Sequence, residues 1–116
     1  MLIANWKSNG SKAMAIDWFD KFYDNYSLIN DETFIGIAPP FIYVDQINNL
    51  KKPNIKTGIQ DIEPSSGART GSISANMAID LGCNFSIIGH SERRALYNES
   101  NYQIKEKIIN LDKKIM

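Results

Sequence analysis

The sequence has no excess of charge, no long hydrophobic run and almost no cysteine. Its 13 basic and 13 acidic residues cancel, so nothing in the net charge indicates a nucleic-acid or anionic-membrane partner. No apolar run approaches the roughly 20 residues of a membrane-spanning helix, and the first residues lack the basic start of a secretory signal. Cys83, the single cysteine, leaves no disulfide framework and is expected to be buried. These absences predict a cytoplasmic globular protein.

The 116 residues instead alternate short apolar runs with amphipathic segments. The predicted strands are residues 2–4, 34–38, 55–60 and 85–88. The predicted helices begin near residues 11, 41, 72 and 100. Repeated strand–helix units indicate an α/β fold with a parallel sheet and right-handed crossovers.

The chain is short for a complete fold of this class. Residues 1–116 have about the length of one small domain, and Ile115 and Met116 resemble the start of a fifth strand. Both ends look cut, which favours a fragment of a larger α/β protein.

Local sequence marks two helix starts and one loop. Ser11 is placed to cap the first helix, and Ser100 with Gln103 fits a capping box that starts the last helix. Residues 63–70 are rich in proline, glycine and serine and are predicted to be a long loop. The first helix carries a stripe expected to be core rather than a ligand site. The stripe consists of Ala15, Ile16, Phe19, Phe22, Tyr23 and Tyr26.

The only histidine of the chain lies where the fourth predicted strand runs out into a loop. Gly89 permits a tight bend before it, and Ser91 is predicted to cap a following helix. A helix N-terminus disfavours a protonated imidazole beside it, so His90 is expected to be neutral and able to donate a hydrogen bond. The alternative is a half-buried histidine with a structural role only.

Asn5 and Lys7 follow the first predicted strand on either side of Trp6. Their spacing places both side chains opposite the indole. A lysine at the carboxyl end of a strand can hold a phosphate or carboxylate and stabilise an oxyanion. The alternative is a solvated surface lysine, but the carboxyl ends of parallel strands meet at one edge, which places Lys7 and His90 on the same side of the sheet.

Five ordered motifs along the chain resemble the triosephosphate isomerase family. They are Asn5–Gly10, Ile37–Pro40, Gly67–Gly71, Asp80–Cys83 and Gly89–Arg94, and the last is the most specific. The resemblance implies a TIM (β/α)8 barrel, of which this chain supplies about the first four units as a half barrel. It also implies interconversion of dihydroxyacetone phosphate and D-glyceraldehyde 3-phosphate through an enediolate, in glycolysis and gluconeogenesis, with no cofactor and no metal.

The resemblance also implies roles for individual residues. His90 corresponds to the electrophile that polarises the substrate carbonyl and moves a proton between the enediolate oxygens. Lys7 corresponds to the lysine that binds the phosphate and stabilises negative charge, and Asn5 to a substrate-binding asparagine. Glu92 corresponds to a catalytic glutamate paired with the lysine, with a simple helix-start acid as the alternative. Thr70 corresponds to a loop-tip residue that crosses the interface of a homodimer.

Two further features follow from the same resemblance. Arg93 and Glu99 correspond to a structural charged pair, whose alternative is an exposed ion pair of little stabilising effect. The carboxylate base that moves a proton on carbon comes, in the family, after the sixth strand, beyond residue 116. Neither Glu63 nor Glu99 has the context to replace it, so residues 1–116 alone are expected to be inactive.

Two other interpretations stay open at this point. The chain could be a half-barrel scaffold that self-associates, because a half barrel leaves two sheet edges free. It could also be a different barrel enzyme that shares only the fold, since fold alone does not define function.

Overall fold

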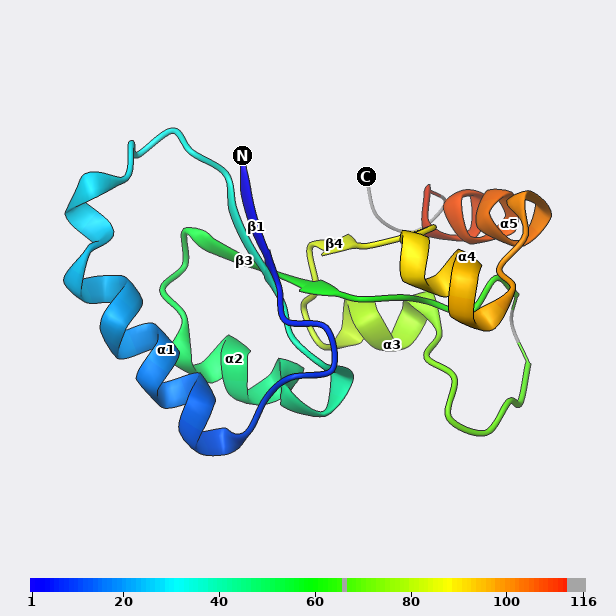
Figure 1. The fold of residues 1–116 in the computed structure, drawn as a ribbon, viewed down its shortest axis with the longest axis horizontal. Helices are drawn as coiled ribbons and strands as arrows, with labels where there is room; N and C mark the ends of the chain where they lie inside the picture. The colour runs from blue at the N-terminus through cyan, green and yellow to red at the C-terminus, as the bar shows by residue number, and fades with distance from the viewer. Residues whose placement is uncertain (66, 113–116) are drawn as a thin grey trace.

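The computed structural model describes residues 1–65 and 67–112 and contains the predicted parallel sheet (Figure 1). The strands are β1 (Leu2–Asn5), β2 (Ile35–Ala38), β3 (Ile55–Ile59) and β4 (Phe85–Ser86). They lie in the order β1-β2-β3-β4, and each pair of neighbours is parallel. This is the arrangement of the first βα units of a TIM barrel, and it confirms the predicted fold class.

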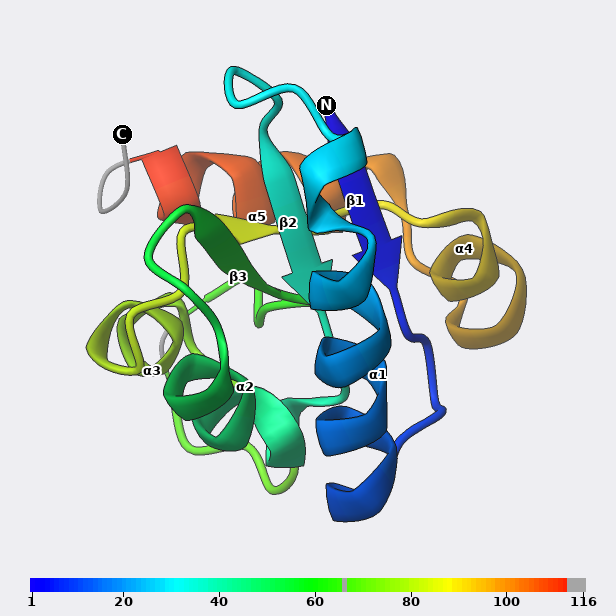
Figure 2. The same ribbon diagram turned by 90° about the vertical axis from the view of Figure 1, so that its left-hand side faces the viewer.

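Helices follow the strands in the connections between them. They are α1 (Lys12–Asp24), η1 (Tyr26–Leu28), η2 (Phe41–Tyr43), α2 (Val44–Leu50), α3 (Ala75–Asp80), α4 (Ser91–Tyr97) and α5 (Asn101–Asp112), where η denotes a 3-10 turn. Helices α1, α2 and α3 lie along one side of the sheet. Helices α4 and α5 lie at the end of the molecule opposite α1 (Figures 1 and 2).

The first core cluster lies between the sheet and the helices α1 and α2. Its buried members are Trp6, Ala15, Phe19, Ile35, Ile37, Ile47 and Ile55. The predicted aromatic stripe of α1 packs here, and Trp18 adds a ring stacked on Phe22. Ile16, predicted to be part of the stripe, is instead half exposed, because the buried face of α1 is centred on Ala15 and Phe19.

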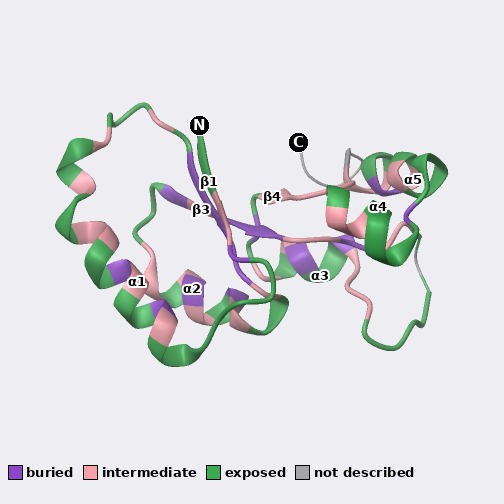
Figure 3. Ribbon diagram, in the orientation of Figure 1, coloured by how far each residue is buried: buried purple, intermediate pink, exposed green. Residues whose placement is uncertain are grey.

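A second core cluster lies between β3 and the helices α2 and α3. Its buried members are Val44, Ile59, Ile62, Ala75, Ala78 and Cys83, and Leu111 of α5 packs against them. Cys83 is buried as predicted, and burial raises the pKa of its thiol. Figure 3 shows that buried residues are concentrated on the strands and on the helix faces turned toward them.

The opposite face of the sheet is lined by an aromatic ring over two glycines. A Cβ atom added to Gly36 or Gly58 would lie 2.7 Å or 2.2 Å from the ring of Phe85. Because Gly36 and Gly58 have no side chains, Phe85 fills the space above them. Phe34 packs edge-on against the same ring.

Two predicted elements are shorter than the sequence indicated. The third helix begins at Ala75, not Ser72, because Ser74 Oγ caps it by accepting from Met77 N. The carbonyl of Ile73 accepts a hydrogen bond from Glu63 N at 2.8 Å, which keeps this residue out of the helix.

The fourth strand ends at Ser86 rather than Ile88. Its partner β3 ends at Ile59, and a single further bond from Ile87 N to Ile59 O continues the pairing. The predicted strand start at Ile115 and Met116 lies outside the described residues. Within the described part of the chain, no helix is long and apolar enough to cross a membrane.

Candidate active site

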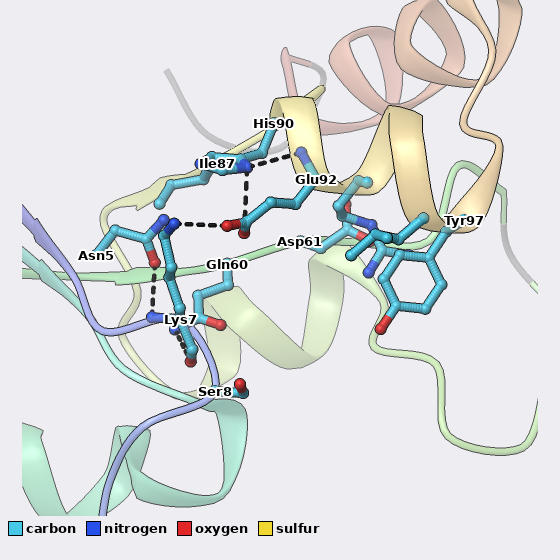
Figure 4. Close-up of a pocket in the computed structure, with 11 residues that line it drawn as sticks. Asn5, Lys7, Ser8, Gln60, Asp61, Ile87, His90, Glu92 and Tyr97 are labelled. Atoms are coloured by element: carbon cyan, nitrogen blue, oxygen red, sulfur yellow. Dashed lines mark hydrogen bonds and ion pairs between the residues drawn. The ribbon is translucent and has the colours of Figure 1, made fainter.

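A pocket lies at the carboxyl ends of β1, β3 and β4, where the predicted site residues meet (Figure 4). Asn5 and Lys7 come from the end of β1, Gln60 from the end of β3, and His90 and Glu92 from the turn that starts α4. The structure therefore brings four of the predicted site residues together and adds Gln60, which the sequence analysis did not identify. Trp6 is buried in the core on the other side of the strand, as the alternation predicted.

The backbone at Lys7 has an unusual conformation that three polar groups support. Lys7 has a φ of 55°, a left-handed value uncommon for a residue with a side chain. Asn5 Oδ1 accepts a hydrogen bond from Lys7 N at 3.0 Å. Gln60 Nε2 donates to Lys7 O at 2.8 Å and to Ala38 O at 2.9 Å. These contacts direct the lysine side chain into the pocket.

Lys7 and Glu92 form an ion pair across the pocket. Lys7 Nζ lies 2.5 Å from Glu92 Oε1, and both side chains remain about half exposed. The hydrogen bond from Lys7 is the largest cause of a lowered pKa of Glu92. Burial opposes it, and the charge of Lys7 and the nearby His90 lower the pKa further. Glu92 is thus an ionised partner of the lysine.

His90 is the N-cap of α4, which corrects the predicted cap at Ser91. The backbone of His90 is non-helical, and its Nδ1 accepts a hydrogen bond from Glu92 N at 3.2 Å. Ser91 is the first residue of the helix. A neutral imidazole that accepts at Nδ1 carries its proton on Nε2, so this contact selects the tautomer that can donate from Nε2. The Nδ1 atom also lies 3.5 Å from Glu92 Oε2.

Thr70 lies apart from this group. It is exposed in the 63–70 loop and lines a separate hollow with Glu63 and Arg69, whose side chains form an ion pair at 3.7 Å. The structure therefore places Thr70 on a loop surface rather than in the pocket of its own chain.

The second predicted pair, Arg93 and Glu99, is not the exposed ion pair that the sequence left as an alternative. Arg93 Nε lies 3.4 Å from Glu99 Oε2, and Glu99 is buried. Asp61 and Lys107 also contact this pair, and neither was predicted. For Lys107, helix periodicity alone does not indicate an inward-facing lysine.

The pocket presents hydrogen-bond donors from several elements to one small volume. The ammonium of Lys7, the amide of Asn5 and the imidazole of His90 can together bind an anion and polarise a carbonyl oxygen. Among the described residues, no group of three or more histidine, cysteine, aspartate or glutamate side chains is placed to hold a metal ion. Parallel βα units with polar groups at the carboxyl ends of the strands are the arrangement of (β/α)8-barrel enzymes.

Comparisons with known proteins make this class specific. A sequence model of the triosephosphate isomerase family matches residues 1–116. Triosephosphate isomerase from Shewanella sp. (strain ANA-3) is 38% identical over 92% of this chain and 44% of its own length. The same identity and coverage are found for the enzyme of Shewanella oneidensis. The chain belongs to the triosephosphate isomerase family, and it spans less than half the length of these relatives.

Proposed function

We propose that the whole protein interconverts dihydroxyacetone phosphate and D-glyceraldehyde 3-phosphate by proton transfer through an enediolate. The observation that carries this proposal is the convergence of Lys7 and His90 at one pocket, with Lys7 paired to Glu92 at 2.5 Å. Residues 1–116 are then the N-terminal half of a single barrel domain.

Four of the residues that line the pocket have a role in this reaction. The ammonium of Lys7 attracts the phosphate and the charge that develops on the substrate oxygens. The Nε2–H of His90 donates to the carbonyl oxygen and stabilises the enediolate as the proton leaves carbon. Asn5 contacts the substrate and supports the Lys7 backbone through its Oδ1. Glu92 keeps Lys7 directed into the pocket until an anionic substrate competes for the ammonium.

The proton on carbon requires a further carboxylate. Glu92 is committed to Lys7 and to the start of α4, and Glu99 is bound by Lys107 and Arg93. In the family, the base follows the sixth strand, beyond residue 116. The catalytic unit is therefore the whole protein, and residues 1–116 alone do not turn over substrate.

The proposed partners are the triose phosphate and a second copy of the whole protein. Residues 67–70, which include Thr70, are exposed, which suits a contact across a homodimer. A cytoplasmic location fits a glycolytic enzyme of this family and stays a prediction.

A second candidate function is that of a self-associating half-barrel scaffold without activity. It is favoured by the exposure of apolar side chains on β1 and at the start of β2: Leu2 is 52% exposed, Ile3 45% and Phe34 36%. Apolar groups on an uncovered sheet favour association.

A coupled enzyme assay separates the two functions. The whole protein and residues 1–116 are purified and supplied with D-glyceraldehyde 3-phosphate, and formation of dihydroxyacetone phosphate is followed. We expect turnover by the whole protein and none by residues 1–116. Absence of turnover by a folded whole protein contradicts the proposed function, and turnover by residues 1–116 contradicts the proposed origin of the base.

A further inference from the structure

The helix that carries the proposed catalytic turn is not held in place by apolar packing. His90 and Glu92 lie at the start of α4, yet none of the residues of α4 is buried. Leu96 and Tyr97, its large side chains, are 73% and 66% exposed. Figure 3 shows α4 without buried positions, in contrast to β3. The position of the catalytic turn therefore depends on polar contacts.

Two of these contacts, from Arg93 to Asp61 and to Glu99, belong to a group of four charged residues, termed here the charge cluster: Asp61, Arg93, Glu99 and Lys107. Arg93 Nε lies 2.9 Å from Asp61 Oδ2 and 3.4 Å from Glu99 Oε2. Lys107 Nζ lies 2.6 Å from Asp61 Oδ1 and also donates to Glu99 Oε2. Each cation thus contacts both carboxylates, and the cluster joins the end of β3 to α4, the following turn and α5.

Lys107 and Glu99 are the buried members of the charge cluster. Lys107 is 4% exposed and Glu99 8%. Burial opposes ionisation of Glu99, but the hydrogen bond and charge of Lys107, followed by those of Arg93, lower its pKa overall. A buried ammonium is costly unless it is paired. Lys107 is therefore a buried, paired lysine of the folded chain and not a solvent-exposed surface lysine.

The charge cluster connects to both halves of the pocket. On one side, the backbone N–H of Arg93 donates to His90 O at 2.9 Å, so a displacement of Arg93 displaces the cap of α4. On the other side, Asp61 directly follows Gln60, which donates to the carbonyl of Lys7. Asp61 and Arg93 also line the pocket with the proposed catalytic residues.

We infer that Lys107, on α5, is a positioning residue for His90 and Glu92, acting through Asp61, Arg93 and Glu99. The inference has two parts. The catalytic part, that Lys107 affects the reaction, rests on the proposed function. The geometric part, that Lys107 holds the His90 cap in place, does not. Without the ammonium of Lys107, two carboxylates share Arg93 alone, Arg93 shifts toward them, and the His90 cap loses its fixed geometry.

The geometric part is tested by nitrogen NMR of the imidazole in residues 1–116. His90 is the only histidine of this chain, so histidine labelled with ¹⁵N gives one pair of ring signals. In the unchanged chain we expect the pattern of a single neutral tautomer, with the proton on Nε2. Lys107→Met should move both signals toward the averaged values of free imidazole. Lys105→Met, at an exposed position of the same helix, should leave them unchanged.

A loss of folding is controlled separately. Circular dichroism and urea denaturation identify conditions in which each variant is folded, and the NMR comparison is made there. If Lys107→Met does not fold, Lys107→Gln is used, which removes the charge but keeps a donor; the same shift is expected. Lys107→Arg, which keeps the charge, should restore the original signals. A folded Lys107→Met or Lys107→Gln chain with unchanged imidazole signals overturns the inference.

The catalytic part is tested in the whole protein with D-glyceraldehyde 3-phosphate. Because a misplacement of about 1 Å can cost on the order of 100-fold in rate, we expect Lys107→Met to lower kcat by about 10- to 100-fold and to affect KM less. If the unchanged whole protein has no isomerase activity, the proposed function fails while the NMR result still decides the positioning role. Unchanged kcat in Lys107→Met contradicts the catalytic part of the inference.

Discussion

At the scale of single residues, one contact of His90 determines both a helix start and a proton position. Its Nδ1 accepts from Glu92 N and so satisfies one of the free N–H groups of a helix N-terminus. The same contact leaves the proton on Nε2. A serine or aspartate cap would satisfy the helix equally well, but neither would provide a ring N–H donor. The cap position therefore suits the proposed electrophile.

Replacement of His90 by glutamine in the whole protein is expected to reduce kcat far more than it raises KM. General acid–base groups typically contribute about 100- to 10,000-fold, and the hydrogen bond from His90 strengthens as the oxyanion develops. Steady-state kinetics with D-glyceraldehyde 3-phosphate measures both constants. Ser27→Ala, at an exposed position of η1, serves as the control. A raised KM with an unchanged kcat would contradict the proposed role.

Lys7→Met is expected to raise the pKa of Glu92. The hydrogen bond from Lys7 is the main cause of the lowered pKa. A carboxyl with a lowered folded-state pKa stabilises the folded state above its unfolded pKa, and this contribution is lost as the pH falls through the folded-state value. Carboxyl ¹³C titration of Glu92 measures the change, with Lys12→Met as the exposed control. An unchanged titration curve means that the ion pair does not persist in solution.

At the scale of elements, local sequence signals predicted the starts of α1 and α5 correctly. Ser11 Oγ caps α1 by accepting from Met14 N at 3.0 Å, and Ser100 and Gln103 form the predicted capping box through mutual hydrogen bonds of 2.9 and 3.2 Å. Such signals are local because donor and acceptor lie within four residues. The length of β4 depends on where β3 ends, and its own sequence does not contain that information.

Part of the candidate site could be predicted because its signals are also local in the sequence. Asn5, Lys7, His90 and Glu92 lie in short motifs at strand ends, which parallel topology brings together. Lys107 contacts Asp61 over a separation of 46 residues, and the sequence of α5 gives it no special position. Distant polar pairs of this kind appear only when the fold is known.

Gly58→Ala is expected to destabilise the sheet through Phe85. Gly58 is not among the glycines with positive φ, so its backbone accepts alanine, but the new Cβ would lie 2.2 Å from the phenyl ring. Overpacking of this kind costs about 1–3 kcal/mol, measured by urea denaturation. In a Phe85→Ala background the same substitution should be nearly neutral. Equal effects of Gly58→Ala in both backgrounds mean that the ring does not occupy this space.

At the scale of the whole molecule, side chains that follow the two edge strands of the described sheet meet at the site. In the described chain, β1 and β4 are the edge strands, separated by β2 and β3. Lys7 follows β1 and Glu92 follows β4, yet their side chains lie 2.5 Å apart. A flat sheet would hold these strand ends about three strand spacings, or roughly 14 Å, apart. The loop after β1, the turn that starts α4 and two long side chains close this distance, so the ion pair joins the two sides of the pocket.

Thr70→Arg is expected to weaken the proposed homodimer of the whole protein by about tenfold or more, since an unpaired charge buried at an interface readily costs 1.4 kcal/mol. The resemblance to the family places this loop tip in the neighbouring subunit, and the loop is free to make such a contact because it is exposed here. Sedimentation velocity over a range of concentrations measures the dissociation constant. Ser27→Arg introduces the same charge at an exposed position of η1 and should leave the dimer intact. A monomeric whole protein, or equal effects of the two substitutions, contradicts the proposed interface.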